Sequence, residues 1–108
     1  MQELFHPDTA DIELASVLHA LADPVRLGIV SRLAATGAEP CGDINDDIAL
    51  HKSTLSHHYR VLREAGITRT SAEGRTRVVR LRADDLEQRF PGVLAAVVNA
   101  ALLAPLTP

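Results

Sequence analysis

Residues 52–67 read KSTLSHHYRVLREAGI, and two sets of side chains run through this stretch at different spacings. At about 100° per residue, an α-helix places Leu55, Tyr59 and Leu62 on one side. The opposite side carries hydroxyls, an imidazole, a guanidinium and a carboxylate, with the threonine at its margin: Ser53, Thr54, Ser56, His57, Arg60 and Glu64. Gly66 is typical of a helix C-cap. The stretch predicts an amphipathic helix that ends at about Ala65, with one face packed and one face free to touch a partner.

The polar face is chemically suited to nucleic acid. Hydroxyls, imidazoles and guanidinium groups donate or accept hydrogen bonds at base edges and phosphates. In a helix-turn-helix, the second helix enters the major groove with its N-terminal residues first. We therefore expect DNA contacts from the N-terminal part of this helix: Lys52, Ser53, Thr54, Ser56, His57, His58 and Arg60. His58 lies between the two faces, so a packed or capping role stays open beside a DNA contact.

The segments on either side complete a winged helix-turn-helix. A short helix from Gly42 to about Ile48 and the link "ALH" precede the quoted helix, which gives a helix-turn-helix over residues 42–65. Residues 67–82, ITRTSAEGRTRVVRLR, alternate as two strands, 67–71 and 75–81, joined by a turn at Gly74. The outward arginines of this β-wing, Arg75 and Arg77, are candidate contacts to a phosphate or the minor groove. Each can equally be an ordinary solvated strand residue.

Three further helical segments are expected. Residues 11–22 are apolar almost all round, which is typical of a helix covered on more than one side. Asp23 is a suitable N-cap with Pro24 at the first helical position, and Gly37 closes that second helix. Arg26 projects near its inner face, where we expect a structural ion pair. Asp84 and Glu87 have the spacing of a capping box for a last helical region, 84–104, that Pro91 breaks or kinks. The fold class is therefore mainly α with a small β-hairpin, in a single domain spanning residues 1–108.

Charge is distributed unevenly along the 108 residues. The whole chain has a net charge of −3, but residues 51–82 hold eight basic and two acidic residues, a local net charge of +6. Such a field suits a polyanion, although a solvated face has the same composition. The N-terminal residues have neither a basic start nor an apolar run, so no secretion signal is expected. The apolar stretch 93–103 falls short of the roughly 20 residues that span a bilayer. We expect a cytoplasmic protein that does not bind a membrane.

Three ordered motifs identify a family. LADPVRLGIVSRL, KSTLSHHYRVLREAGI and EGRTRVVRLRADDLEQRF, over roughly residues 12–100, resemble the ArsR/SmtB family of bacterial winged helix-turn-helix repressors. The resemblance implies a homodimer that binds double-stranded DNA at a dyad-symmetric operator and is released by an effector. It implies pairing through the first and last helices, at 11–22 and 84–104, and the apolar residues there become candidate interface residues: Leu14, Leu18, Leu94, Val97, Val98, Ala101 and Leu102.

The metal sites of that family do not carry over. Arsenic-sensing members have a Cys-x-Cys pair at the start of the third helix, but here Cys41 stands alone. Zinc- and nickel-sensing members place Asp and His ligands on the last helix, which lacks histidine here. We therefore expect no metal site and no cofactor, and leave an unidentified small-molecule effector open. Cys41 is a candidate redox or effector site. A buried inert thiol and a mixed zinc site with His51 or His6 are the alternatives.

Two other classes of function compete with DNA binding. No phosphate-binding glycine loop, metalloprotease motif or nucleophile elbow is present, so we expect no enzyme. A protein-interaction module that uses the apolar last helix is the stronger alternative. DNA binding with a steep salt dependence distinguishes a regulator from such a module.

Overall fold

The computed structural model describes residues 4–103, so positions 1–3 and 104–108 of the predicted domain lie outside the described residues. Its elements, in chain order, are a 3-10 helix η1 (Thr9–Asp11), α1 (Leu14–Leu21), α2 (Pro24–Thr36), β1 (Ala38–Pro40), α3 (Cys41–Asp47), α4 (Lys52–Glu64), β2 (Thr68–Glu73), β3 (Thr76–Leu81), α5 (Ala83–Arg89) and α6 (Val93–Leu103). The predicted winged helix-turn-helix is the observed fold: α3 and α4 form the helix-turn-helix, and β2 and β3 form the wing.

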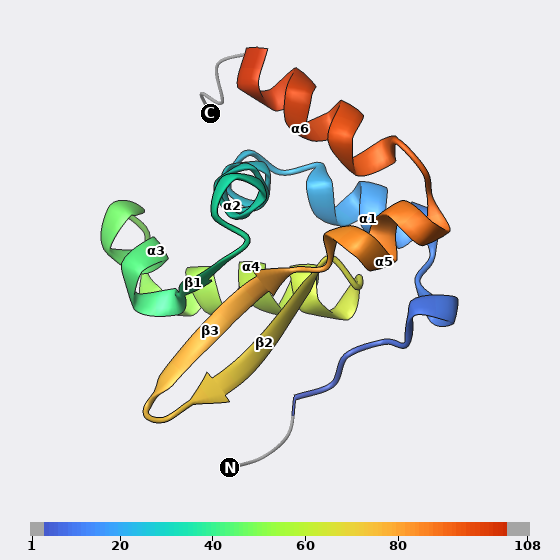
Figure 1. Cartoon of the computed structure of the whole chain (residues 1–108). Helices are drawn as coiled ribbons and strands as arrows, with labels where there is room; N and C mark the ends of the chain where they lie inside the picture. Colours follow the sequence, from blue (N-terminus) through green and yellow to red (C-terminus); the bar gives the residue numbers. More distant parts are fainter. Residues whose placement is uncertain (1–3, 104–108) are drawn as a thin grey trace.

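The wing projects away from the helices, and α6 lies on the opposite side of the molecule (Figure 1). The two strands of the wing, β2 and β3, pair in antiparallel register, with Thr70 opposite Val79. A third strand, β1, pairs with the other edge of β3, which gives the strand order β1-β3-β2. Strand β1 was not predicted from the sequence, because it is only three residues long and pairs with residues about forty positions away.

The quoted helix, α4, is fixed by the packing that its apolar spacing predicts. Leu55 and Leu62 are buried, and Leu62 belongs to one core with Ile29, Leu33 and Val79. Burying each such side chain contributes roughly 1.5–3 kcal/mol. Because these anchors come from α2, α4 and the wing, the core sets the position of the helix-turn-helix relative to the wing.

Helix α2 begins and ends as predicted. The Asp23 side chain accepts hydrogen bonds from the backbone amides of Val25 at 2.9 Å and Arg26 at 3.0 Å. These bonds satisfy two of the donors that a helix N-terminus leaves free. Gly37 closes the helix with a φ of 83°. The sequence therefore defines this helix at both ends.

An arginine on α2 holds the first helix of the helix-turn-helix. Arg32 forms two hydrogen bonds of 2.7 Å with Glu39 of β1 and one of 2.6 Å with Asp47 of α3. The guanidinium fork matches the carboxylate geometry, and the hydrogen bonds from Arg32, together with its charge, lower the pKa of Glu39. This network joins α2, β1 and α3 into one unit.

The two terminal helical regions differ from expectation. Residues 11–22 contain the end of η1 and the shorter α1 rather than one helix. The capping box at Asp84 is wrong: α5 starts one residue earlier, at Ala83, and has no side-chain cap. The reason is tertiary, because Arg82, just before α5, is buried and donates to Pro7 O at 2.8 Å and Asp85 Oδ2 at 2.9 Å. The break at Pro91 is confirmed, since α5 and α6 are separate helices.

Helix α6 uses part of the predicted dimer interface inside its own chain. Val98 and Ala101 are only 9% and 8% exposed, because this side of α6 packs against α2. Leu94 and Val97 also pack partly against the core. Val98 and Ala101 therefore have little surface left for an intersubunit contact, whereas Leu94 and Val97 remain partly exposed. Leu102, in contrast, is 71% exposed.

The length and composition of the helices also bear on membrane insertion. No single helix within residues 4–103 is both long and apolar enough to cross a bilayer. Helices α1 and α2 reach that length and composition only as a pair, and they are bent by 103°.

Candidate nucleic-acid interface

The outer face of α4 is open to solvent. All of the predicted contact residues except His58 are exposed: Lys52, Ser53, Thr54, Ser56, His57 and Arg60. The helix begins at a cap that the sequence pattern did not predict, in which His51 Nδ1 accepts from the backbone amide of Ser53 at 3.2 Å. The same nitrogen lies 2.8 Å from Ser53 Oγ, so this hydroxyl already has a partner at the helix start.

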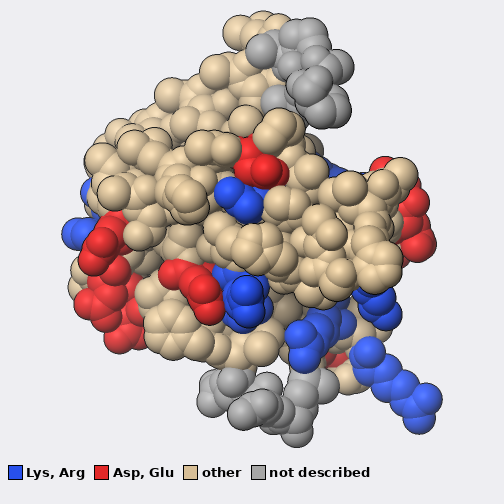
Figure 2. Space-filling model, turned by 180° about the vertical axis from the view of Figure 1, so that it is seen from behind, with Lys and Arg blue, Asp and Glu red and all other residues tan. Residues whose placement is uncertain are grey.

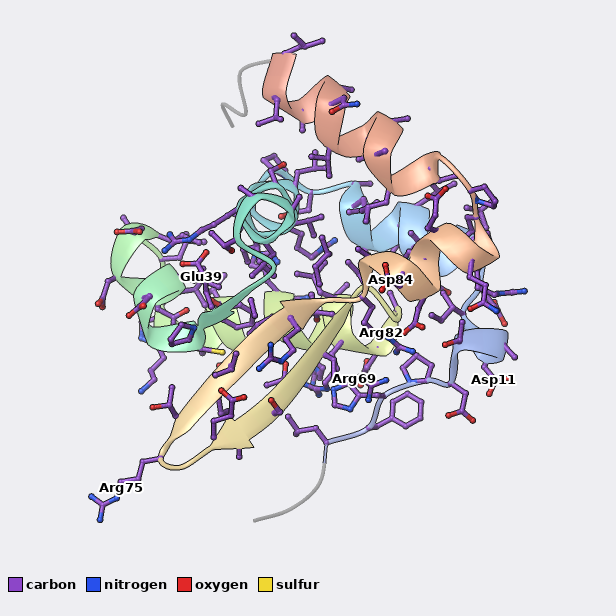
Figure 3. All side chains as sticks on the ribbon, viewed as in Figure 1. Asp11, Glu39, Arg69, Arg75, Arg82 and Asp84 are labelled. Atoms are coloured by element: carbon purple, nitrogen blue, oxygen red, sulfur yellow. The ribbon has the colours of Figure 1, made fainter. Side chains whose placement is uncertain are left out.

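One wing arginine joins the α4 residues in a single groove. The groove has a volume of about 330 Å³. Besides Leu4 it is lined by five residues of α4 and one of the wing: Ser53, Ser56, His57, Arg60, Arg63 and Arg77. Arg75 instead lies at the tip of the hairpin and points away from the helices (Figure 3). The structure therefore brings Arg77 to the α4 surface and leaves Arg75 further out.

Positive charge gathers at the wing end of the molecule. Figure 2 shows Lys and Arg side chains gathered at the lower right, acidic side chains at the two edges and in the middle of this face, and an almost uncharged upper part around α6. Arg80 is paired with Glu73 at 2.8 Å, and Arg82 with Asp85, so these two are already neutralised. The cations left for a polyanion come mainly from α4 and from the wing residues Arg75 and Arg77.

His58 belongs to a buried cluster rather than to the outer face. It is 8% exposed, and Arg26 Nη1 lies 3.1 Å from its Nδ1. Arginine can only donate, so Nδ1 is the acceptor and the imidazole is neutral. Asp23 Oδ2 lies 3.9 Å from the same nitrogen. Of the two roles left open for His58, the structure favours the packed one.

Within residues 4–103, Arg26 does not form the expected ion pair with a carboxylate. Its guanidinium donates to the backbone carbonyl of Ala20 at 2.6 Å, to that of His19 at 3.5 Å, and to His58. The cluster thus joins the end of α1, the start of α2 and the middle of α4. Its hydrogen bonds hold α4 from behind the face that points outward.

This cluster makes the stability of the fold depend on pH. Burial lowers the pKa of His58, and the nearby Arg26 and His57 lower it further, against the opposing effect of Asp23. The unfolded chain therefore binds a proton at a higher pH, near the ordinary value of about 6.5. The contribution of neutral His58 is complete above that pH and is lost as the pH falls through the lower folded-state pKa.

We expect the free energy of unfolding to fall between about pH 7.5 and 5, and to fall less steeply in His58→Gln, because glutamine can accept from Arg26 without titrating. Urea denaturation at several pH values measures this dependence. His19→Gln is the matched control, since it removes an exposed imidazole that is not among the groups shifting the pKa of His58. The pKa of His6 is also lowered by burial, but both variants retain it. Equal pH dependence in His58→Gln and the unmodified chain would contradict the prediction.

The proposed mixed zinc site finds little support in the geometry. His51 caps α4, and His6 Nε2 accepts from the backbone amide of Thr70 at 3.0 Å. Across residues 4–103, no three His, Cys, Asp or Glu side chains come together as a metal site. Cys41 is half-buried, and burial raises the pKa of its thiol, with Arg77 opposing the shift. A protonated thiol is a poor nucleophile, which disfavours the redox switch.

Comparison with known proteins places this site in a family. The family model described as a helix-turn-helix domain matches residues 21–71. The crystal structure of an ArsR family transcriptional regulator has the same fold, with a TM-score of 0.61, 21% identity, and coverage of 92% of this chain and 90% of that one. The transcriptional regulator YceK of Bacillus subtilis (strain 168) is 40% identical over 81 residues, which is 74% of this chain and 81% of YceK. The chain belongs to the ArsR/SmtB family.

As an ArsR/SmtB family member, the chain is a DNA-binding transcriptional regulator. A further relative, the biofilm growth-associated repressor of Agrobacterium fabrum (strain C58), is 36% identical over 88 residues, covering 82% of this chain and 74% of the repressor. These comparisons point to a family of regulators rather than of enzymes. The α3–α4 unit lies inside the matched region, and β3 lies beyond it.

Proposed function

We propose that the protein is a repressor that binds a dyad-symmetric operator as a homodimer. Helix α4 would read base edges in the major groove, and the wing would contact the DNA backbone. The observation that carries this proposal is the groove that Arg77 shares with Ser53, Ser56, His57 and Arg60. A helix face and a wing residue that line one surface can contact the same stretch of duplex. Because its partner is chromosomal DNA, the proposal includes a cytoplasmic location.

The test is DNA binding as a function of salt. Genomic fragments that the purified protein retains are sequenced, and the enriched site is titrated at about 50 and 200 mM salt. A dimer that neutralises about six to ten phosphates should lose roughly a thousandfold or more in affinity between these concentrations. A scrambled fragment of equal length is the control for sequence preference. No enrichment, or binding that does not depend on salt, would leave the protein-interaction module as the better interpretation.

The proposed dimer uses the exposed leucines of the first and last helices. Leu14, Leu18, Leu102 and Leu103 are 42%, 47%, 71% and 88% exposed. Large apolar patches are uncommon on monomers and typically mark interaction sites. Since Val98 and Ala101 serve the chain's own core, we replace them with Leu103 in the proposed interface.

Light scattering should give twice the mass of the chain at micromolar concentration. Leu18→Glu and Leu102→Glu should shift the protein toward monomer, because each places a charge in the proposed apolar contact. Leu50→Glu is the matched control: Leu50 is 40% exposed but lies in the α3–α4 turn. A monomer for the unmodified chain, or the same shift in the control, would overturn this assignment.

A further inference from the structure

A second cavity lies between α3, α4 and the wing. Its volume is about 250 Å³, somewhat below the roughly 300–1,000 Å³ of pockets that hold drug-sized ligands. Residues from four elements line it: Cys41, Asn45, Lys52, Ser56, Tyr59, Arg63, Thr70 and Arg77. Its size suits a small molecule of a few tens of atoms at most.

The lining is positively charged. Among residues 4–103 its lining contains Lys52, Arg63 and Arg77 and no acidic side chain. Among the described residues, none of these three cations forms an ion pair, because the carboxylates that pair with arginine neutralise Arg32, Arg80 and Arg82 instead. Three like charges around one cavity favour an anion inside it.

Arg63 supplies a specific donor. Its Nε is buried, and within residues 4–103 it has no hydrogen-bond partner. A buried polar atom without a partner costs free energy and calls for an explanation. A guanidinium group donates two parallel hydrogen bonds to a carboxylate or phosphate. Arg63 lines the cavity, so an anion there would bind its guanidinium group, and a shift of the side chain would bring the buried Nε into that contact.

The other walls stay neutral. Burial raises the pKa of the Cys41 thiol and also that of the Tyr59 hydroxyl, so neither becomes an anion near neutral pH. The Tyr59 hydroxyl already donates to Asn45 Oδ1 at 2.6 Å. The thiol and the phenol ring thus add weakly polar surface beside the cations. A ligand with one anionic group and a compact apolar body matches both the cationic side chains and the weakly polar surface of Cys41 and Tyr59.

We propose that this cavity binds a small organic carboxylate or phosphate, with its anionic group on Arg63. Binding of the anion to this cavity does not depend on the proposed DNA-binding function. Its effect on DNA rests on the proposed function: Lys52, Ser56 and Arg77 line the cavity and are also predicted DNA contacts, so a bound anion would compete with the operator. A phosphate of the DNA backbone has the same chemistry, and the experiment must separate these two sources.

The first arm uses the full chain without DNA. Calorimetry is done with benzoate, phenyl phosphate and, as a cation of similar size, benzylamine. At least one anion should bind with a millimolar or lower dissociation constant, and benzylamine should not. Arg63→Gln should weaken binding of that anion at least tenfold. Arg69→Gln removes an exposed arginine of β2 that does not line the cavity, and should leave binding unchanged. No binding of either anion, equal binding of benzylamine, or unchanged binding by Arg63→Gln would overturn the proposal.

Arg63→Lys is the second variant, for use if Arg63→Gln does not fold. Lysine keeps the positive charge but cannot donate two parallel hydrogen bonds. The anion should therefore still bind, with a dissociation constant at least threefold higher than for the unmodified chain.

The second arm titrates operator DNA with and without saturating anion. Lower DNA affinity in both the unmodified chain and Arg63→Lys, with Arg63→Lys needing at least threefold more anion for the same fractional loss, supports competition. Unchanged DNA affinity would show that the anion does not compete with the operator, while the anion-binding site itself would still be supported by the first arm. Failure to bind any DNA would overturn the proposed function, while the first arm still decides the site. If substitution of Arg63 weakens the binding of DNA but not that of the small anions, the proposed small-anion site is wrong.

Discussion

Alanine at Ser56, His57 or Arg60 is expected to cost about 1–3 kcal/mol at the cognate operator and to relax its sequence preference. These side chains are exposed, they lie on the outer face of α4, and they line the groove that Arg77 shares. Their removal takes away hydrogen bonds to base edges but leaves the core packing of α4 intact. Titration of the operator and of single-base variants measures both effects.

The wing provides the comparison. Replacing Arg75 or Arg77 with alanine should weaken binding to all sequences more evenly, and should reduce the salt slope by about one for each phosphate that is no longer neutralised. Arg75 at the hairpin tip and Arg77 in the groove reach different points of the duplex (Figure 3). Relaxed specificity in the wing variants, with specificity kept in the α4 variants, would show that the wing is the reading element.

Local patterns predicted most of the elements of this fold. The spacing of Leu55 and Leu62 indicated the buried side of α4, and Asp23 with Gly37 indicated the ends of α2. Such signals depend only on neighbours along the chain, so a single sequence carries them. They also identified the exposed face of α4, because a residue opposite a buried stripe is exposed in any packing of that helix.

Features that depend on distant partners were not predictable in this way. His58 is buried because Arg26, 32 positions away, donates to it. Arg82 prevents the expected cap because Pro7, 75 positions away, accepts from it. Helix α6 is apolar on nearly every side, so its sequence did not reveal that Val98 and Ala101 face α2.

The cavity next to Arg63 could not be predicted for the same reason. Arg63 lies near the end of α4, where a basic residue is ordinarily explained by the helix dipole. The cavity lining comes from α3, α4, β2 and β3 together. Only the packed wing brings Arg63, Arg77 and Cys41 to the lining of one cavity. Sequence spacing within one helix contains no sign of this arrangement.

Gly66 links α4 to the wing, and the chain turns there with a φ of 89°. Its amide donates to Arg63 O at 3.1 Å, and the next amide, of Ile67, donates to Leu62 O at 3.0 Å, which closes the helix. A Cβ at this position would lie 2.6 Å from Ile12 Cγ1. Ile12 is 1% exposed, and its carbonyl accepts from Arg89 Nη2 at 2.6 Å. The isoleucine therefore has little room to move away.

Gly66→Ala is expected to destabilise the fold by about 2–5 kcal/mol, the sum of a left-handed backbone penalty and overpacking against Ile12. Gly92→Ala is the matched control, because Gly92 has a similar φ of 82° and no atom within 4 Å of an added Cβ. It should cost only the backbone part, about 1–2 kcal/mol. Urea denaturation at one fixed protein concentration measures both. Equal losses of stability in the two variants would mean that the contact with Ile12 contributes nothing.

A double-mutant cycle isolates that contact. Ile12→Ala alone should cost about 2–5 kcal/mol, because it empties a filled site in the core. In the double variant the new methyl group at position 66 occupies part of the space that Ile12 leaves. The combined destabilisation should therefore be smaller than the sum of the two single effects by about 1–3 kcal/mol. Additive effects would place the strain in the backbone of Gly66 alone. A combined effect smaller than the sum would show that Gly66, just after α4, packs directly against Ile12 in the segment before α1.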